Sequence, residues 1–396
     1  MSAHSFPTET AGLSCPFMPV FGPPQVMFVR GDGTELWDHT GKRYLDFLCG
    51  LAVTSLGHSN PAVTQALCAQ ASTLLHVSNF FANDVATAAA LEVRALLAET
   101  TGADGQVFFC NSGAEANEAA LKLARKFGGR GRHVVVSAYG SFHGRTLATL
   151  AATGQPAKHE PFFPMPDGFR HVAYGDLDAC RAAIDPSVAA VLIETVQGEG
   201  GVIPADPDYL RGLRALCDER GMLLMIDEVQ TGFGRTGRWF GFEHAGIQPD
   251  VVTMAKALGN GFPVGAVWAK TEVAAAFQPG DHGSTYSGTA IATAVVRAVL
   301  AEMRRIDAPA LAAERGAYLR ARLEALPQVA SVRGQGLLLA AELGDGADAK
   351  AAYAELLQRG LVTNAVTATA LRLAPPLTVT TDEIDEAVAL IAAVLA

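Results

Sequence analysis

Short, continuously apolar runs alternate with amphipathic stretches through the middle of the chain. The first run covers residues 107–110, the last covers 266–269, and helical patterns such as 209–220 lie between them. A strand that is apolar at every position is buried on both faces, which is typical of a mostly parallel sheet. The pattern therefore predicts an α/β fold in which helices cover both faces of a mostly parallel, mixed sheet. The other strands and helices expected in this region are strands 133–136, 188–193, 222–226 and 251–254, and helices 116–127 and 291–304.

The two ends of the chain contain shorter units, which predict a second, smaller domain. Near the N-terminus, apolar residues at 26–29, 35–37 and 44–47 are separated by glycine turns, as in antiparallel strands. Beyond residue 307, helices alternate with single strands, which is typical of an α+β domain. We expect an N-terminal arm and hairpin segment at 1–60 that joins the small domain, a large domain at 61–305, and a C-terminal small domain at 306–396. The elements expected at the two ends are helices 61–74 and 84–100, a helix ending at 326, strand 336–343, helix 349–358, strand 371–373, and a final helix after 382.

The composition is that of a large globular protein, with 396 residues of which 49% are hydrophobic and 18% are charged. The net charge of −10 argues against nucleic acid as a partner, because phosphate binding requires a basic surface. No apolar run approaches the roughly 18 residues that span a bilayer, and the first residues lack the pattern of a signal peptide. The six cysteines are far apart and form no CxxC pair, so we expect reduced core thiols, no metal site and a cytoplasmic location.

A glycine-rich turn follows the apolar run 251–254, and Lys256 stands where the two meet. At the end of a buried strand an ammonium group loses hydration, which lowers its pKa and favours the neutral, nucleophilic amine. This is the state that a Schiff-base lysine requires. A strand-end lysine that points into water is the alternative interpretation, and this stretch alone does not exclude it.

Ser112-Gly113-Ala114 lies between a predicted strand and a predicted helix, within the stretch 111–117. Small residues allow backbone N–H groups to approach an anion, and the N-terminus of a helix favours phosphate. An ordinary strand–helix turn capped by Ser112 is the alternative interpretation. Neither GK[ST] nor GxGxxG occurs in this strand–helix turn, so neither a Walker site nor a nicotinamide-binding site is expected there.

Two further groups of functional residues follow strands of the predicted sheet. Phe142, His143 and Arg145 share one loop, where an aromatic face can stack on a heteroaromatic cofactor and a guanidinium can bind a carboxylate. Asp227 closes an apolar strand, and a buried carboxylate there can pair with a protonated pyridine nitrogen. The alternative for the loop is a packed Phe142 and a surface Arg145. The alternative for Asp227 is a strand-end helix cap or a salt bridge. Because ligands of open α/β sheets bind at the carboxyl ends of the strands, the phosphate turn, Asp227 and Lys256 together predict a pyridoxal-phosphate site.

The same stretches resemble the class-III (subgroup II, ω-amino) pyridoxal-phosphate aminotransferases, from about Gly31 to the C-terminus. Within this class they are most similar to the acetylornithine aminotransferases. The resemblance implies the fold-type I architecture and a homodimer with shared active sites. It also implies transfer of the terminal amino group of N2-acetyl-L-ornithine to 2-oxoglutarate, a step of arginine biosynthesis that yields N-acetyl-L-glutamate 5-semialdehyde and L-glutamate. The matching segments are 109–118, 142–146, 227–232, 255–259 and 282–286.

The resemblance implies a role at the cofactor for each matching residue. Lys256 would form the Schiff base and move the proton, and Asp227 would pair with the pyridine nitrogen. The other residues that the resemblance assigns to the cofactor are Phe142 and Val229 on the two ring faces, Gln230 at the ring hydroxyl group, Ser112, Gly113 and Ala114 at the phosphate, and Thr285, which would reach the phosphate of the neighbouring subunit.

The resemblance also implies how two different substrates use one site. Arg145 would bind the α-carboxylate of acetylornithine and the side-chain carboxylate of glutamate. Arg372 would bind the α-carboxylate of glutamate, and Glu199 would neutralise it while the ω-amino donor is bound. Ser284 would border the substrate. The residues alone do not pair Glu199 with Arg372. Glu199 could equally be a charge on a surface loop, and Arg372 a charge on a strand.

Two short stretches depart from the family pattern without removing a catalytic group. Residues 287–290 are Ser-Gly-Thr-Ala where the family has Gly-Gly-Asn-Pro, and Thr195 stands where a proline usually follows the strand. Phe80 and Phe81 lie where the family lines the substrate entrance. Phe80 or Phe81 is a candidate pocket wall, and for one of them a core aromatic is the favoured interpretation.

Three alternative functions are weighed against this prediction. An enzyme of the same class could use ornithine, succinylornithine, N-succinyl-diaminopimelate, 4-aminobutyrate or carrier-bound lysine as its donor. A non-catalytic pyridoxal-phosphate-binding homologue would lack Lys256 or Asp227, and both are present. An NAD-dependent dehydrogenase would carry the glycine fingerprint directly between a strand and a helix, and the strand–helix turn at 111–117 lacks it.

Overall fold

The computed structural model describes residues 18–22, 24–344 and 346–396. Residues 1–17 and 23 of the predicted N-terminal arm lie outside this description. A seven-stranded sheet forms the centre, and the prediction of an α/β fold with a mostly parallel, mixed sheet is confirmed. β12 runs antiparallel to both of its neighbours, β4 and β11. In spatial order the strands are β4 (Gly105–Cys110), β12 (Gly265–Lys270), β11 (Val251–Met254), β10 (Leu223–Asp227), β7 (Val188–Glu194), β5 (Val134–Ala138) and β6 (Phe169–Val172).

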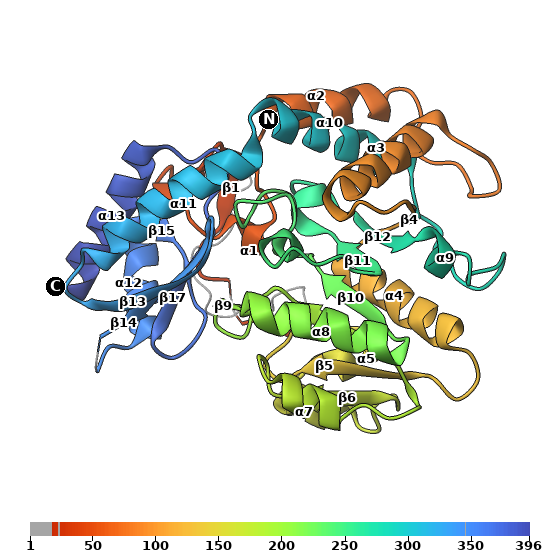
Figure 1. Ribbon diagram of the computed structural model, residues 1–396. Coiled ribbons are helices and arrows are strands. Elements are labelled where there is room, and N and C mark those ends of the chain that lie inside the picture. Colours follow the sequence, from red (N-terminus) through yellow and green to blue (C-terminus); the bar gives the residue numbers. More distant parts are fainter. Residues whose placement is uncertain (1–17, 23, 345) are drawn as a thin grey trace.

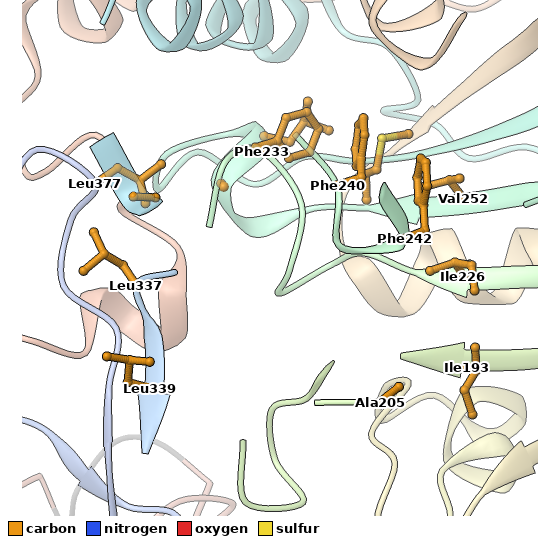
Figure 2. Close-up of a cluster of buried hydrophobic side chains, with 14 of the residues drawn as sticks. Ile193, Ala205, Ile226, Phe233, Phe240, Phe242, Val252, Leu337, Leu339 and Leu377 are labelled. Carbon is orange, nitrogen blue, oxygen red and sulfur yellow. The ribbon is translucent and has the colours of Figure 1, made fainter. Parts of the chain in front are cut away.

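Both faces of this sheet are buried, as the continuous apolar strands predict. Along β10, Leu223 and Met225 pack in one apolar cluster, whereas Leu224 and Ile226 pack in another. Alternate residues of a strand point to opposite faces, so helices must cover the sheet on both sides. Figure 2 shows part of the larger cluster, in which Ile226 lies near Phe242. One face is covered by α4 (Gly113–Gly128) and α9 (Thr271–Ala274), and the other by α3 (Asp84–Thr101), α8 (Pro207–Arg220) and α10 (Ala290–Arg305).

Two smaller sheets are built from the ends of the chain (Figure 1). In the first, β15 from the C-terminal region pairs in parallel with β3 from the N-terminal region. The second is antiparallel, and helices from the C-terminal region pack beside it. The strands are β1 (Phe28–Asp32), β2 (Glu35–Asp38), β3 (Arg43–Asp46) and β15 (Leu361–Val362) in the first sheet, and β13 (Val329–Gln335), β14 (Leu338–Leu343), β17 (Ala370–Leu373) and β16 (Asn364–Ala365) in the second. The helices of the C-terminal region are α11 (Ala308–Glu324), α12 (Ala349–Arg359) and α13 (Thr381–Leu395).

The structure adds elements that the sequence pattern does not predict and shifts others. The helix expected at 116–127 begins earlier, because Ser112 caps α4 and Gly113 is its first residue. The strand expected at 336–343 is β14, and β13 precedes it. The remaining elements are α1 (Cys49–Ala52), α2 (Pro61–Ala71), α5 (Leu147–Ala152), α6 (Pro156–His159), η1 (Glu160–Phe162), α7 (Leu177–Ala182), β8 (Val196–Gln197), β9 (Ile203–Pro204), η2 (Gly241–His244) and η3 (Lys256–Leu258).

Several expectations about surface and interior are also settled by the fold. Cys68 is exposed on α2, so the expectation that every cysteine is a core thiol is wrong for this residue. Phe80 and Phe81 are 93% and 71% exposed, so neither is a core aromatic in this chain. Within residues 18–22, 24–344 and 346–396, no helix combines the length and apolarity needed to cross a bilayer.

Candidate active site

A cavity of about 530 Å³ lies at the carboxyl ends of the central strands. β10 ends at Asp227, β7 ends at Glu194, and Lys256 comes two residues after β11. Parallel strands bring their carboxyl ends to one edge of a sheet, so residues distant in sequence meet there. The predicted site residues that line this cavity are Ser112, Gly113, Ala114, Phe142, Arg145, Glu199, Asp227, Val229, Gln230 and Lys256.

Lys256 starts η3 with its backbone in the left-handed region, at φ 47°. A non-glycine residue rarely adopts this conformation, and such strain is concentrated at functional sites. The pKa of Lys256 is lowered to about 8, chiefly by burial; the Glu199 carboxylate opposes this shift, the Arg372 guanidinium adds to it, and Asp227 opposes it. The cavity therefore holds a lysine that releases its proton more readily than an exposed lysine does, as the sequence predicts.

Asp227 is 4% exposed and is held by three hydrogen bonds. Its Oδ2 accepts from Asn117 Nδ2 and from His143 Nδ1, both at 2.8 Å, and its Oδ1 accepts from the Val229 N–H at 3.0 Å. Thr253 Oγ1 in turn donates to Asn117 Oδ1 at 2.8 Å. Oδ2 thus accepts hydrogen bonds from two side chains. Among the described residues, Oδ1 accepts only from a backbone N–H, so it retains acceptor capacity for a ligand in the cavity.

Asn117 and His143 belong to the site, although sequence reasoning gave neither a role. Asn117 is 1% exposed on the buried face of α4, and the His143 side chain is fully buried. His143 Nε2 is buried and has no hydrogen-bond partner in the part of the chain that the structure describes. The ring therefore engages Asp227 through Nδ1 alone. For Asn117, the sequence offers one signal, which is a polar residue on the apolar face of a predicted helix. A buried polar group needs a partner, so such a residue indicates a contact in the interior.

The N-terminus of α4 forms one wall of the cavity. Ser112 caps the helix, because its Oγ accepts from the Glu115 N–H at 3.2 Å. Gly113 packs closely against Val229, since a Cβ at this position would lie 2.8 Å from Val229 Cγ1. The first N–H groups of a helix and its dipole favour an anion, so this wall has the properties of a phosphate site.

Phe142 and Arg145 lie in the loop between β5 and α5. The Phe142 N–H donates to Glu194 Oε2 at 3.1 Å, which fixes the loop against the end of β7. Burial, together with the carboxylate of Asp227, raises the pKa of Glu194 well above its usual range. The guanidinium carbon of Arg145 lies 5.3 Å from the centre of the Phe142 ring, and the Arg145 side chain is exposed to the cavity. The loop therefore presents an aromatic ring and an accessible cation together.

Glu199 and Arg372, which the sequence alone does not pair, form an ion pair. Arg372 on β17 is 1% exposed, and its Nη1 donates to Glu199 Oε1 at 2.5 Å. Its Nε donates to Asn364 Oδ1 at 3.0 Å, and its Nη2 is buried without a partner among the described residues. Burial opposes ionisation of Glu199, but the Arg372 guanidinium outweighs it, so the pKa of Glu199 is lowered. Glu199 lines the cavity, whereas Arg372 is not among the lining residues. The cavity thus presents one accessible arginine, and Glu199 masks a second one behind it.

Ser284 and Thr285 lie elsewhere in this chain. Ser284 lines a second cavity, of about 740 Å³, where its Oγ accepts from Asn111 Nδ2 at 3.2 Å. Thr285 is exposed and does not line the cavity of Lys256. Phe81, one of the two predicted wall residues, also lines the second cavity. The roles proposed for Ser284 and Thr285 in the substrate and phosphate sites therefore remain predictions.

The sequence profile of the class-III aminotransferases matches residues 19–395. The chain belongs to this family. It is 45% identical over 379 residues to an acetylornithine aminotransferase of Caldanaerobacter subterraneus subsp. tengcongensis, which covers 93% of this chain and 94% of the relative. It is 47% identical over 363 residues to an acetylornithine aminotransferase of Bacillus subtilis strain 168, covering 91% and 92%. The solved ornithine aminotransferase of Toxoplasma gondii with partial PLP occupancy superimposes with a TM-score of 0.88 at 33% identity, covering 96% of this chain and 91% of that one.

The cofactor of this class-III aminotransferase is pyridoxal phosphate, and the cavity fits it. Pyridoxal phosphate offers a phosphate, a pyridine nitrogen and an aldehyde, which need an anion site, a carboxylate and an amine. The α4 N-terminus, Asp227 and Lys256 supply these three groups within one cavity. The unshared acceptor capacity of Asp227 Oδ1 is the observation that most directly calls for a protonated nitrogen there.

Proposed function

We propose that this aminotransferase transfers the terminal amino group of N2-acetyl-L-ornithine to 2-oxoglutarate. The products are N-acetyl-L-glutamate 5-semialdehyde and L-glutamate. The observation that carries this proposal is the Glu199–Arg372 pair beside the accessible Arg145. An ω-amino donor such as N2-acetyl-L-ornithine has one carboxylate, which Arg145 can bind, and an apolar carbon chain that leads to the amine. A second, unpaired arginine beside this chain would lose its hydration without gaining a partner. The names of the two bacterial relatives support the same donor.

The residues of the cavity divide the chemistry between them. When bound, pyridoxal phosphate supplies an electron sink for the carbon that carries the transferred amine. Asn117 and His143 hold Oδ2 of Asp227, which leaves Oδ1 directed to a ligand. This carboxylate would favour the protonated form of the ring nitrogen. Lys256, with its lowered pKa, accepts and returns the proton at the donor's terminal carbon.

The two substrates are accommodated by different states of one ion pair. N2-Acetyl-L-ornithine binds through Arg145 while Glu199 covers Arg372. 2-Oxoglutarate places its side-chain carboxylate at Arg145 and its α-carboxylate at Arg372, from which Glu199 withdraws. Both substrates occupy the same cavity, so the first product leaves before the second substrate enters, and we expect ping-pong kinetics.

We further propose the domain division 1–60, 61–305 and 306–396, with the first segment joined to the last. The parallel pairing of β15 with β3 supports this division, since it links the two ends of the chain in one sheet. We also propose a cytoplasmic homodimer with shared sites. Thr285 does not line its own chain's cavity, which supports its reaching the site of the neighbouring subunit.

The test is a donor panel with 2-oxoglutarate as the acceptor. We expect the highest kcat/KM for N2-acetyl-L-ornithine, in comparison with ornithine, succinylornithine, N-succinyl-diaminopimelate, 4-aminobutyrate and carrier-bound lysine. A preference for free ornithine or 4-aminobutyrate would overturn the assignment of the donor. Lys256→Ala should abolish turnover with every donor, and normal turnover in this variant would overturn the assignment of the chemistry.

A further inference from the structure

A fully buried arginine, Arg235, connects the loop after β10 to three segments that are distant in sequence. It lies between β10 and η2, and its side chain is 0% exposed. Its Nη1 donates to the carbonyl oxygens of Leu337 at 3.1 Å and Pro375 at 2.5 Å. Its Nη2 donates to Ser55 Oγ at 2.9 Å. One guanidinium thus joins the central part of the chain to segments that adjoin the smaller sheets.

Arg235 holds these segments without an acidic partner. Among the residues that the structure describes, no carboxylate forms an ion pair with it, and burial lowers its pKa to about 10. A buried charge that is not paired costs free energy, and an apolar side chain of similar volume is often equally stable in such a position. The guanidinium is therefore unlikely to be explained by packing alone, whereas its N–H groups, which point in several fixed directions, account for the contacts.

The loop that carries Arg235 is fixed to the central sheet at both of its ends. At its start, the Glu228 N–H donates to the carbonyl oxygen of Thr253 on β11 at 2.9 Å. At its end, the buried Glu228 carboxylate accepts from the N–H groups of Gly241 and Phe242, both at 3.0 Å. The guanidinium is thus held on the same framework as the lysine and the aspartate of the cavity.

Two of the three acceptors of Arg235 lie at one end of the strand pair that carries Arg372. Pro375 follows Arg372 by three residues, just beyond β17. Leu337 precedes Ala340 by three residues, and Ala340 on β14 is the antiparallel register partner of Arg372. The Leu337 N–H also donates to the carbonyl oxygen of Arg235 at 3.0 Å. Arg235 therefore holds both strands at the same end.

Arg372 has a second attachment to the central part of the chain, which passes through the loop of Glu199. Its Nη1 donates to Glu199 Oε1 at 2.5 Å and to the Gly198 carbonyl oxygen at 3.3 Å. In the proposed reaction, Glu199 withdraws when the α-carboxylate of 2-oxoglutarate binds Arg372. The contacts of Arg235 do not involve Glu199, so they persist when this ion pair opens.

We propose that Arg235 is a positioning residue for the acceptor, which holds β17 so that Arg372 stays where it can bind the α-carboxylate of 2-oxoglutarate. The inference rests on the proposed function, because it takes Arg372 as the site of that carboxylate. N2-Acetyl-L-ornithine binds through Arg145, in the loop between β5 and α5, and does not use Arg372. Arg235 therefore serves the acceptor half of the reaction and not the donor half.

The test measures kcat/KM of the holoenzyme for each substrate, because in a ping-pong reaction each value reports on its own half of the cycle. Arg235→Met keeps an unbranched side chain but removes every donor. We expect kcat/KM for 2-oxoglutarate to fall about tenfold, and kcat/KM for N2-acetyl-L-ornithine to change by less than about twofold. Arg235→Lys retains a cation without the planar fork, so its loss should be smaller and confined to the same substrate.

Leu216→Ala is the control for loss of stability alone. Leu216 is 1% exposed on α8, which packs on β7 and β10, so its truncation leaves a cavity in the core. This variant should lower Tm without changing the ratio of the two kcat/KM values. Cofactor absorbance and Tm establish which variants are folded, and Arg235→Lys makes the comparison if Arg235→Met is not. Failure of both to fold would assign Arg235 to the stability of the fold and overturn the proposal.

Arg372→Gln separates this inference from the proposed function. If it leaves kcat/KM for 2-oxoglutarate unchanged, the assignment of the acceptor site fails and the inference falls with it. If it lowers this value, the acceptor site stands. The positioning role of Arg235 is then overturned if the Arg235 variants change kcat/KM for both substrates by the same factor, or change neither.

Discussion

At the scale of single residues, the site depends on groups whose charge is set by their surroundings. The pKa of Lys256 is lowered to about 8 from its ordinary 10.5, first by burial. The folded apoprotein thus holds this proton less tightly than the unfolded chain does. This residue contributes least to stability below pH 8, and its contribution increases as the pH rises from about 8 to 10.5.

The pKa of Lys256 can be read from the reactivity of its amine. We expect the rate at which the apoenzyme combines with pyridoxal phosphate to rise with pH, with a midpoint near pH 8. The carboxylate of Glu199 raises this pKa and the guanidinium of Arg372 lowers it, so Glu199→Gln should move the midpoint to lower pH and Arg372→Gln to higher pH. Stopped-flow absorbance measures the rate. A midpoint near pH 10, or shifts of the opposite sign, would contradict the electrostatic account.

His143 is a positioning residue for Asp227, and its contribution can be tested separately from its bulk. His143→Leu removes the 2.8 Å donor to Asp227 Oδ2, whereas His143→Asn retains an amide N–H close to the position of Nδ1. We expect the leucine variant to bind pyridoxal phosphate about tenfold more weakly and the asparagine variant to remain close to the unmodified protein. Equilibrium titration of the apoenzyme by fluorescence gives both values. Equal losses in the two variants would indicate a purely steric role.

Local sequence patterns indicate residues at the ends of strands, but they do not indicate contacts between distant parts of the chain. Lys256 and Asp227 were predicted because the end of an apolar strand marks a position in space. Asn117 and His143 received no role because their partner Asp227 lies 110 and 84 residues away, and no local pattern reports such a contact. The Glu199–Arg372 pair, 173 residues apart, came from resemblance for the same reason.

At the scale of elements, the strands buried on both faces were predictable, whereas two edge strands, β13 and β6, were not. β13 is the edge of its sheet and is mostly half-buried or exposed, so its sequence Val-Ala-Ser-Val-Arg-Gly-Gln carries no continuous apolar signal. β6 is the edge of the central sheet, and its Phe-Arg-His-Val has a polar centre. Hydrophobic periodicity reports burial, and β13 and β6 are too little buried along their length to show it.

The departure from the family pattern at residues 287–290 is explained by local structure. Thr289 caps α10, since its Oγ1 accepts from the Ala292 N–H at 3.4 Å. Ser287 Oγ lies 2.9 Å from Ser284 Oγ. Thr and Ser thus stabilise the start of the helix and the preceding loop. Thr195 has no comparable account, because its buried Oγ1 has no partner among the described residues.

The start of α4 permits a prediction about a single methyl group. In Gly113→Ala the new Cβ would lie 2.8 Å and 2.9 Å from the two methyl carbons of Val229, which must move within the cavity. We expect pyridoxal phosphate to bind about tenfold more weakly while Tm changes little. The double variant Gly113→Ala/Val229→Ala should regain part of the affinity because it restores the space. Gly344→Ala is the control, since its Cβ would make only ordinary contact. Unchanged affinity in Gly113→Ala would show that this packing is not required.

At the scale of the whole molecule, several large apolar side chains are exposed on one surface. Leu75, Phe80, Phe81 and Tyr286 are each more than half exposed. They gather on one surface, because the rings of His76 and Tyr286 lie 5.5 Å apart and Phe81 shares the second cavity with Ser284. An exposed apolar patch of this kind is typical of a protein–protein interface. It lies beside Thr285, the residue proposed to serve the neighbouring subunit.

The proposed shared-site homodimer predicts that two defective variants complement each other. Lys256→Ala disables its own chain's site, whereas Thr285→Glu should repel the phosphate bound in the partner subunit. In a hybrid dimer, the site with an intact lysine receives Thr285 of the partner subunit and is complete. Random pairing at equal expression makes half of the dimers hybrid, each with one of its two sites complete. Co-expression should therefore restore about a quarter of the unmodified activity, while each variant alone remains inactive.

The same experiment separates a shared site from dimerisation alone. Light scattering of the unmodified enzyme should give twice the chain mass, and each variant should keep that mass, because Lys256 lies in the cavity and Thr285 is one exposed residue beside a larger apolar patch. A dimer whose co-expressed variants show no more activity than their sum would mean that Thr285 acts outside the partner's site. A monomer with full activity would exclude both proposals. The apolar patch of Leu75, Phe80, Phe81 and Tyr286 would then be left for another partner.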